Sequence, residues 1–317
     1  MDAFDTRGPA LALRQFEIHD RATIAIGQSG KIAELWYPII ADTPYQRVLD
    51  LRIQADFVWR LTHDVEIGNR LLHATVPSGR SAAIELSYLV ERRPTRPFSD
   101  SNVAGLAIPN ASSGVERWLR AEKHIEVTHA TESLALEIVA GETDAFLQAK
   151  RIFDYVTSTM VYDATRQSHV GSSEHAMVCS VGNCSDIHAL FISLARSVGI
   201  PARLVLGQAL QPELDLCGYH CWAEFFVTGM GWVPADASCA CKYAGAEHFG
   251  RLDINHVAWS VGRDILLTPA QRGPRLIFFA GPYLELDGVP HTNVSRTVTL
   301  TPAAAAPGPI CEPCVTC

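Results

Sequence analysis

The chain has 317 residues, of which 48% are hydrophobic and 19% charged, so it is long enough for two domains that each bury a core. A formal net charge of −8, without a cluster of Lys and Arg, argues against nucleic acid or an anionic membrane as a partner. No apolar run approaches the roughly 18 residues that span a bilayer. The opening residues lack a basic segment followed by an apolar stretch, so we expect a soluble, cytoplasmic protein without a secretory signal.

The first third of the chain has the pattern of β-strands. Between about residues 12 and 93, short segments rich in β-branched and aromatic residues partly alternate apolar with polar positions: LRQFEIHD, ATIAIG, IAELWYPI, RVLDLRIQA and SAAIELSYLVE. Residues 94–113 collect Pro, Ser, Asn and Gly, which is typical of a linker. We therefore predict an antiparallel β domain with its linker over residues 1–113.

Helical periodicity begins after this linker. The segments TESLALEIVAG and ETDAFLQAKRIFDYVTSTM predict two helices, and a third is predicted over residues 184–198, ending at Gly199 with Pro201 beyond. Strands are predicted at ARLVLGQAL, HCWAEFFV and GWVPADAS, the last two joined by a tight turn, and a further β segment at PRLIFFAGPYLEL. This α+β region is assigned to residues 114–301. The Pro-rich remainder, 302–317, is interpreted as a flexible tail that contains cysteines.

The sequence GNCSDIHAL places Cys184 at the start of the third predicted helix. A thiolate there is stabilised by unpaired backbone N–H groups and by the helix dipole, which lowers the pKa and favours nucleophilic attack. Gly182 lets the backbone turn into the helix, and the amide of Cys184 could donate to a developing oxyanion. A buried structural thiol explains this segment equally well, so the residues around Cys184 must distinguish a nucleophile from a structural cysteine.

A cysteine nucleophile needs a base, and the base needs an orienting acceptor. His220, Trp222 and Glu224 alternate along one predicted strand and so share a face. The turn after this strand returns the chain to Asp236, whose carboxylate could reach one imidazole nitrogen of His220 and leave the other for Cys184. The combination of a Gly-x-Cys helix start, a histidine on a strand and an aspartate after the hairpin is more specific for a catalytic triad than any one of these features.

These motifs are similar to those of the transglutaminase-like superfamily, especially its bacterial cysteine peptidase branch. The resemblance rests on GNCSDIHALFISLARSVGIPARLVLGQAL, GYHCWAEFFVTGMGWVPADAS, HFGRLDINHVAWSVGRDI and GPRLIFFAGPYLELDG, and it spans nearly half the chain. It implies a papain-like α+β fold for the second domain and maps Cys184, His220 and Asp236 onto nucleophile, base and orienting acid. Nothing maps onto the calcium sites of the animal members, so no cofactor is expected.

Several neighbouring residues have open roles. Asn183, or a side chain in the loop 171–181, is a candidate second oxyanion donor. Trp222 could wall the substrate groove, and Glu224 could contact substrate or anchor the strand. Asp186 lies in the first helical turn, where a carboxylate favours the dipole, and His188, one turn after Cys184, is a second candidate base.

The other cysteines are first interpreted as free or redox-sensitive thiols, because disulfides rarely persist in the cytosol. If the strands are regular, Cys221, Cys239 and Cys241 face away from the chemistry. Together with Cys217 and the tail residues Cys311, Cys314 and Cys317 they could form a thiolate metal site, but their spacings do not fit the usual zinc patterns, so no metal is expected.

The sequence thus predicts a cysteine enzyme that attacks an amide or other acyl carbon and forms a thioester. Its partner would be a peptide, protein or amide substrate, with an amine acceptor if the thioester is transferred rather than hydrolysed. Hydrolysis is favoured because water is always present. The competing hypothesis is a non-enzymatic scaffold or metal-binding protein on a transglutaminase-like fold that has lost its activity.

Overall fold

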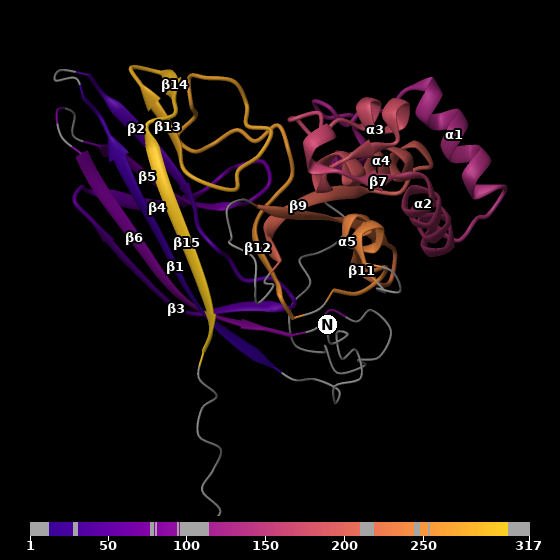
Figure 1. Ribbon diagram of the computed structural model, residues 1–317, viewed down its shortest axis with the longest axis horizontal. Coiled ribbons are helices and arrows are strands. Elements are labelled where there is room, and N and C mark those ends of the chain that lie inside the picture. Colours follow the sequence, from indigo (N-terminus) through magenta and orange to yellow (C-terminus); the bar gives the residue numbers. More distant parts are fainter. Residues whose placement is uncertain are drawn as a thin grey trace, which may run out of the picture.

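The computed structural model describes residues 13–27, 31–76, 79, 81–93, 95, 114–209, 219–243, 248–252 and 254–303. It is a mixed α+β structure in which antiparallel sheets formed largely by the first part of the chain lie beside a helical region built around a smaller sheet (Figure 1). This arrangement confirms the predicted fold class. Within the described residues, no helix is long and apolar enough to cross a membrane.

Two antiparallel sheets form the β region. One has the order β15(Val294–Pro302), β1(Arg14–Ala25), β6(Ser81–Arg92), β3(Gln46–Ala55); the other has the order β14(Val289–His291), β13(Tyr283–Leu286), β2(Ala33–Pro38), β5(Arg70–Val76), β4(Trp59–His63). Alternate residues of β1 and β6 are buried, as expected of strands with one face on a core. Their inward side chains join those of β2 and β5 in one hydrophobic cluster that includes Phe16, Ile18, Leu35, Leu72 and Leu86.

The β region is completed by residues from the far end of the chain. Strand β15 pairs with β1 and strand β13 pairs with β2, so segments more than 200 residues apart in sequence lie side by side (Figure 1). The division of the sequence after residue 113 assigns these late strands to the second domain, whereas in space they belong to the β sheets. Of the predicted linker 94–113 the structure describes residue 95 alone, and residues 304–317 of the tail lie outside the described residues.

Two details of the strand predictions differ from the structure. LRQFEIHD and ATIAIG form the single strand β1, because their alternation continues without a break. PRLIFFAGPYLEL is a strand only over β13, since its first half lies in a loop whose Phe279 packs with Trp36, Ile265 and Leu267 in a separate apolar cluster.

A central helix organises the second region. Helix α4(Cys184–Ser197) is buried from Cys184 to Arg196 and contacts α1(His129–Val139), α2(Ala145–Thr159) and α3(Ser173–Cys179), together with the sheet strands β9 and β10. That sheet has the order β11(Gly231–Ala235), β10(His220–Val227), β9(Ala202–Ala209), β12(His256–Val261). The short helix α5(Ala237–Lys242) follows β11 directly. The remaining elements are β7(Val161–Tyr162), β8(Val181–Gly182) and the 3-10 helices η1(Glu116–Leu119) and η2(Ala164–Arg166).

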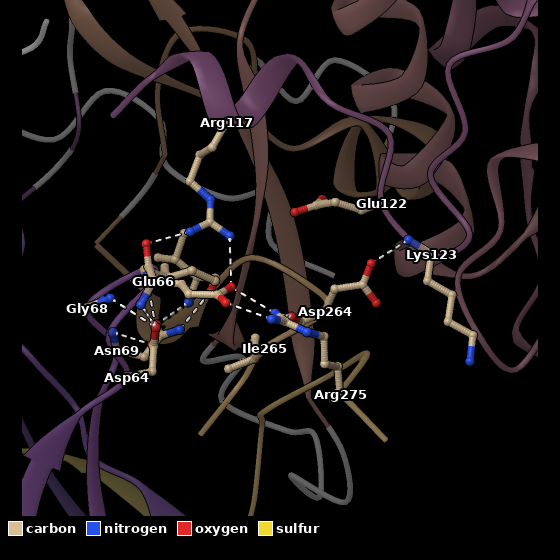
Figure 2. Close-up of polar contacts among 12 residues, drawn as sticks. Asp64, Glu66, Gly68, Asn69, Arg117, Glu122, Lys123, Asp264, Ile265 and Arg275 are labelled. Carbon is tan, nitrogen blue, oxygen red and sulfur yellow. Dashed lines mark hydrogen bonds and ion pairs between the residues drawn. The ribbon is translucent and has the colours of Figure 1, made fainter. Parts of the chain in front are cut away.

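The loop between β4 and β5 joins the two regions, as Figure 2 shows. The carboxylate of Asp64 is buried. It accepts hydrogen bonds from the backbone amides of four consecutive residues in this loop: Glu66, Ile67, Gly68 and Asn69. The loop so shaped presents Glu66 to Arg275, at 2.6 Å, and to Arg117 of η1, at 3.8 Å. Charged contacts around this loop therefore add to the apolar packing of Val257 and Trp259 of β12 on the core of the β region.

Candidate active site

Cys184 occupies the first position of helix α4. The helix begins there because the side-chain oxygen of Asn183 accepts hydrogen bonds from the amides of Ser185 and Asp186, while the Asp186 carboxylate accepts from the amide of Asn183. The Cys184 side chain is 5% exposed. The thiol is therefore held at a capped helix N-terminus, as the sequence predicts.

The entry to this helix requires a glycine. A Cβ atom on Gly182 would lie 2.6 Å from the Cβ of Asp186, much closer than real side chains approach. Asp186 is fully buried and also accepts from the amides of Ser168 and Ser172. Its role in the structure is thus to hold the loop before α3 against the start of α4.

His220 and Asp236 meet as the predicted hairpin suggested they could. His220 begins β10, and Asp236 follows β11 as the N-cap residue of α5. The β10–β11 register pairs Ala223 with Ala235, which brings the next residue, Asp236, close to the start of β10. Nε2 of His220 lies 2.7 Å from Oδ2 of Asp236. Since Asp236 occupies Nε2, Nδ1 is the nitrogen available to Cys184.

The Cys184 thiol lies beside the His220 side chain, close enough for the ring to lower the pKa of the thiol. The structure therefore brings together the three residues that the sequence placed in a triad. Cys184 comes from a helix, His220 from a strand and Asp236 from a helix cap, so their meeting depends on the packing of α4 against β10.

The electrostatics of the three groups favour a thiolate beside an imidazolium. The pKa of Cys184 is held well below its usual value, first by a hydrogen bond from the Cys221 thiol and then by the hydrogen bond and charge of His220, against the opposing effect of burial. Burial disfavours the charged form of His220, but the charge and hydrogen bond of Asp236 outweigh it and raise the pKa of the imidazole well above its usual value. Burial likewise opposes ionisation of Asp236, yet the His220 charge and the surrounding donors keep the pKa of that carboxyl well below its usual range.

Asp236 is satisfied by four donors although it is fully buried. Oδ2 accepts hydrogen bonds from Nε2 of His220 and, at 3.1 Å, from Nε2 of His256 in β12. Oδ1 accepts from the hydroxyl of Ser238 and from the amide of Cys239, both at 2.9 Å, and the residue is fully buried. His256 was not singled out from the sequence, although it lies in the quoted segment HFGRLDINHVAWS. Only the pairing of β12 with β9 brings it to the site.

His188 is not placed to act as the base. Its Nε2 accepts a hydrogen bond from the amide of Ala237 at 3.0 Å, so the ring proton lies on Nδ1, which donates to the carbonyl of Cys184 at 2.7 Å. The ring is fully buried. His188 therefore braces the start of α4 against the start of α5.

The three residues predicted to contact substrate or an oxyanion have other partners. Asn183 uses its side-chain oxygen as the helix cap and donates Nδ2 to Gln167. Trp222 is 2% exposed and packs with Val205, so it does not wall an open groove. Glu224 forms an ion pair with Arg203 of the neighbouring strand, at 2.6 Å, and so anchors the strand.

The prediction that the nearby cysteines face away from the chemistry was wrong for two of them. Cys221 is fully buried and close enough to Cys184 to lower the pKa of its thiol, because β10 packs directly on α4 and its inward face meets the helix start. Cys239 lies in α5 rather than in a strand, which turns its Sγ to 3.9 Å from Nε2 of His220. Cys241 is half-buried, and burial raises the pKa of its thiol to about 11. Cys217 and the tail cysteines lie outside the described residues.

One group of side chains has the chemistry of a metal site. The ligand atoms of His220, Asp236, Cys239 and His256 all lie within 4.8 Å of one another. The sequence suggested a cluster of cysteines, whereas this set contains one cysteine, two histidines and an aspartate. Two of its members, His220 and Asp236, also belong to the triad.

Comparison with known proteins agrees with this geometry. Residues 132–237 match the transglutaminase-like superfamily, and this part of the chain is a domain of that superfamily. An uncharacterized protein of Haemophilus influenzae is 25% identical over 307 residues, covering 83% of each chain. A crystal structure from Cytophaga hutchinsonii, named a "Putative Cysteine Protease", superposes with a TM-score of 0.63 at 14% identity, over 93% of this chain and 92% of the other, and so shares the fold.

Proposed function

We propose that the protein is a cysteine enzyme that acts on amide or peptide bonds through Cys184, His220 and Asp236. The observation that carries the proposal is the Cys184 thiol at a capped helix N-terminus, beside a His220 ring whose Nε2 lies 2.7 Å from the buried Asp236 carboxylate. The transglutaminase-like domain that contains all three residues supports it.

The proposed reaction has two steps. The Cys184 thiolate attacks the acyl carbon, and its own backbone amide, which has no acceptor inside the helix, donates to the developing oxyanion. The His220 imidazolium then protonates the leaving amine, which gives a thioester and neutral His220. Water or an amine attacks the thioester while His220 takes the proton, and the thiolate is restored.

Both outcomes of the second step use the same three side chains. Hydrolysis would make the protein a peptidase or amidase, and transfer to an amine would make it a transglutaminase or amide-forming enzyme. We favour hydrolysis, since water needs no binding site of its own. A peptide, protein or amide is accordingly the proposed substrate.

An activated acyl ester tests the proposal without knowledge of the natural substrate. Incubation with p-nitrophenyl acetate should give a burst of nitrophenolate, with the acetyl group mapped by peptide mass spectrometry to Cys184. The burst should be lost in Cys184→Ala and slowed in His220→Ala, while Cys179→Ala, which removes an exposed cysteine at the end of α3, should keep it. Adding a primary amine then divides the products between acetate and amide, and their ratio distinguishes hydrolysis from transfer.

A different result would favour the scaffold hypothesis. If acetylation is slow and spread over several cysteines, and Cys184→Ala labels as the wild type does, Cys184 is not an activated nucleophile and the enzymatic proposal fails.

A further inference from the structure

The cluster around Asp236 contains more ligand groups than a catalytic triad requires. Besides His220 and Asp236 it includes a second imidazole, His256, and a thiol, Cys239. Asp236, Cys239 and His256 are buried, and the His220 side chain is 11% exposed. Three different elements supply them: β10 gives His220, β12 gives His256, and the start of α5 gives Asp236 and Cys239. Two nitrogens, one oxygen and one sulfur form a donor set that suits Zn²⁺.

The atoms are close to the separation that one tetrahedral ion imposes. Ligands at the usual zinc bond lengths are about 3.3 to 3.6 Å apart. Here Oδ2 of Asp236 lies 2.7 Å from Nε2 of His220 and 3.1 Å from Nε2 of His256, and Sγ of Cys239 lies 3.9 Å from Nε2 of His220. These three distances differ from the ideal by about half an ångström, and all four ligand atoms lie within 4.8 Å of one another, so the ion would need shifts of at most about 1 Å.

We propose that His220, Asp236, Cys239 and His256 bind one Zn²⁺ or a similar thiophilic divalent cation, and that this ion inhibits the enzyme. The binding part stands on the cluster alone, whereas the inhibitory part rests on the proposed function. Oδ1 of Asp236 keeps its bonds to Ser238 and the Cys239 amide, which hold the carboxylate in place with Oδ2 directed at the ion.

Binding exchanges protons for the metal. The ion takes the lone pair of Nε2 on each imidazole, so the proton that each nitrogen donates to Asp236 leaves for solvent or moves to Nδ1, and Cys239 binds as the thiolate after losing its proton. His220 then holds a proton only on Nδ1, in a neutral, metal-bound ring that is a much weaker acid than imidazolium. The step that needs this proton, departure of the amine, would stop.

Cobalt provides a probe that is independent of activity. Co²⁺ bound by a thiolate gives an intense near-ultraviolet charge-transfer absorption, which reports a sulfur ligand directly. The titration uses the full chain with Cys311, Cys314 and Cys317 replaced by Ser, so that tail thiols do not contribute. We expect one Co²⁺ per chain with this absorption, displaced by Zn²⁺.

Variants assign the ligands. Cys239→Ala should abolish the absorption, and His256→Gln should weaken Co²⁺ binding by at least about tenfold. Cys241→Ala, two residues further along the same short helix, is the matched control and should titrate as the parent does. Circular dichroism and thermal melting of each variant without metal identify any that fails to fold. If Cys239→Ala does not fold, the assignment rests on His256→Gln, with Cys241→Ala as the control.

The outcomes separate the two proposals. Absence of the absorption in the parent chain, or its persistence in Cys239→Ala, would overturn the metal site. The Cys184→Ala chain should still bind Co²⁺, because Cys184 is not a ligand, even if the enzymatic proposal fails. Given activity toward p-nitrophenyl acetate, Zn²⁺ should suppress the steady turnover that follows the burst, over the concentration range that fills the site in the parent, because metal-bound His220 cannot take the proton of the attacking water. Turnover unchanged at full occupancy would overturn the inhibitory role.

Discussion

Cys184 and Cys221 have opposite acid–base properties although their thiols are hydrogen-bonded. Burial and the neighbouring Cys184 raise the pKa of Cys221, so it keeps its proton and donates it to the Cys184 thiolate. Such a donor stabilises the ionised nucleophile in the way that a backbone amide stabilises a carboxylate.

Replacing Cys221 by Ala should therefore raise the pKa of Cys184. The thiolate would form only at higher pH, and the pH profile of alkylation by iodoacetamide should shift upward by one unit or more, an order-of-magnitude expectation. Cys221→Ser, which retains a donor, should shift it less. An unchanged profile in Cys221→Ala would show that His220 alone sets the acidity of Cys184.

His256 is the second imidazole that contacts Asp236, and its removal should affect the reaction. His256→Ala removes one donor from Oδ2 and leaves His220 as its sole side-chain partner, so His220 loses part of its orientation but keeps its ion pair. In metal-free protein, burst rates with p-nitrophenyl acetate should fall roughly tenfold or less, compared with a larger loss in His220→Ala. His256→Gln can still donate and should recover part of the rate, a rescue that a purely structural role would not produce.

Residue by residue, the sequence predicted the members of the triad better than their surroundings. Cys184, His220 and Asp236 were recognisable because each lies at the end of an element, where periodicity changes. Cys221 was misassigned because alternation along a strand shows which residues share a face but not which face meets α4. His256 required knowledge of the β9–β12 pairing, which no local pattern encodes.

At the scale of elements, the start of α4 depends on a carboxylate that the sequence left with an open role. Asp186 accepts from Ser168, Ser172 and Asn183 while fully buried, so it joins the preceding loop to the helix that bears Cys184. A buried carboxylate with several donors contributes far more than an exposed one interacting with the helix dipole.

Asp186→Ala should lower the free energy of unfolding by roughly 3 kcal/mol, because it leaves several buried donors without an acceptor. Glu132→Ala is the matched control, since Glu132 is also an acid in the first turn of a helix, α1, but is exposed, and it should change stability by about 0.5 kcal/mol or less. Urea unfolding followed by circular dichroism measures both. Similar losses in the two variants would contradict the bracing role.

The length of α4 was predictable almost to the residue. The Asn183 cap and the glycine at φ +82°, Gly199, are local signals, and the helix runs between them. By contrast, α5 was interpreted as the end of a strand, because ADASCACK has no apolar period and becomes helical only through the cap that Asp236 supplies.

For the whole molecule, the loop from Asp64 to Asn69 is one of the places where the two regions contact each other (Figure 2). The two acidic residues of this loop differ in their surroundings. Asp64 is 2% exposed and bonds backbone amides, whereas Glu66 is more exposed and bonds the guanidinium groups of Arg275 and Arg117.

Asp64→Ala should therefore destabilise the protein by roughly 2 to 3 kcal/mol, and Glu66→Ala by about 1 kcal/mol or less, because exposed ion pairs are screened by solvent. The Glu66→Ala effect should shrink further in high salt, while the Asp64→Ala effect should persist. Thermal unfolding at low and high salt tests both, and a larger effect of Glu66→Ala would mean that the ion pairs contribute more to stability than the hydrogen bonds that shape the loop.

The overall arrangement was the least accessible to sequence reasoning. The segments of β1 and β15 both have strand patterns, but pairing between residues about as far apart as Phe16 and Pro302 leaves no local trace. A division by sequence position therefore separated strands that share one sheet.

The most direct test of the central claim is the rate of alkylation of each cysteine by iodoacetamide at about pH 6, measured by peptide mass spectrometry in the wild type and in His220→Ala. Because the pKa of Cys184 is depressed, a larger fraction of it is thiolate at this pH than of an ordinary thiol. We predict rapid, selective labelling of Cys184 that slows strongly in His220→Ala. Slow labelling without preference for Cys184, equal in both proteins, would contradict an activated nucleophile and with it the proposed triad.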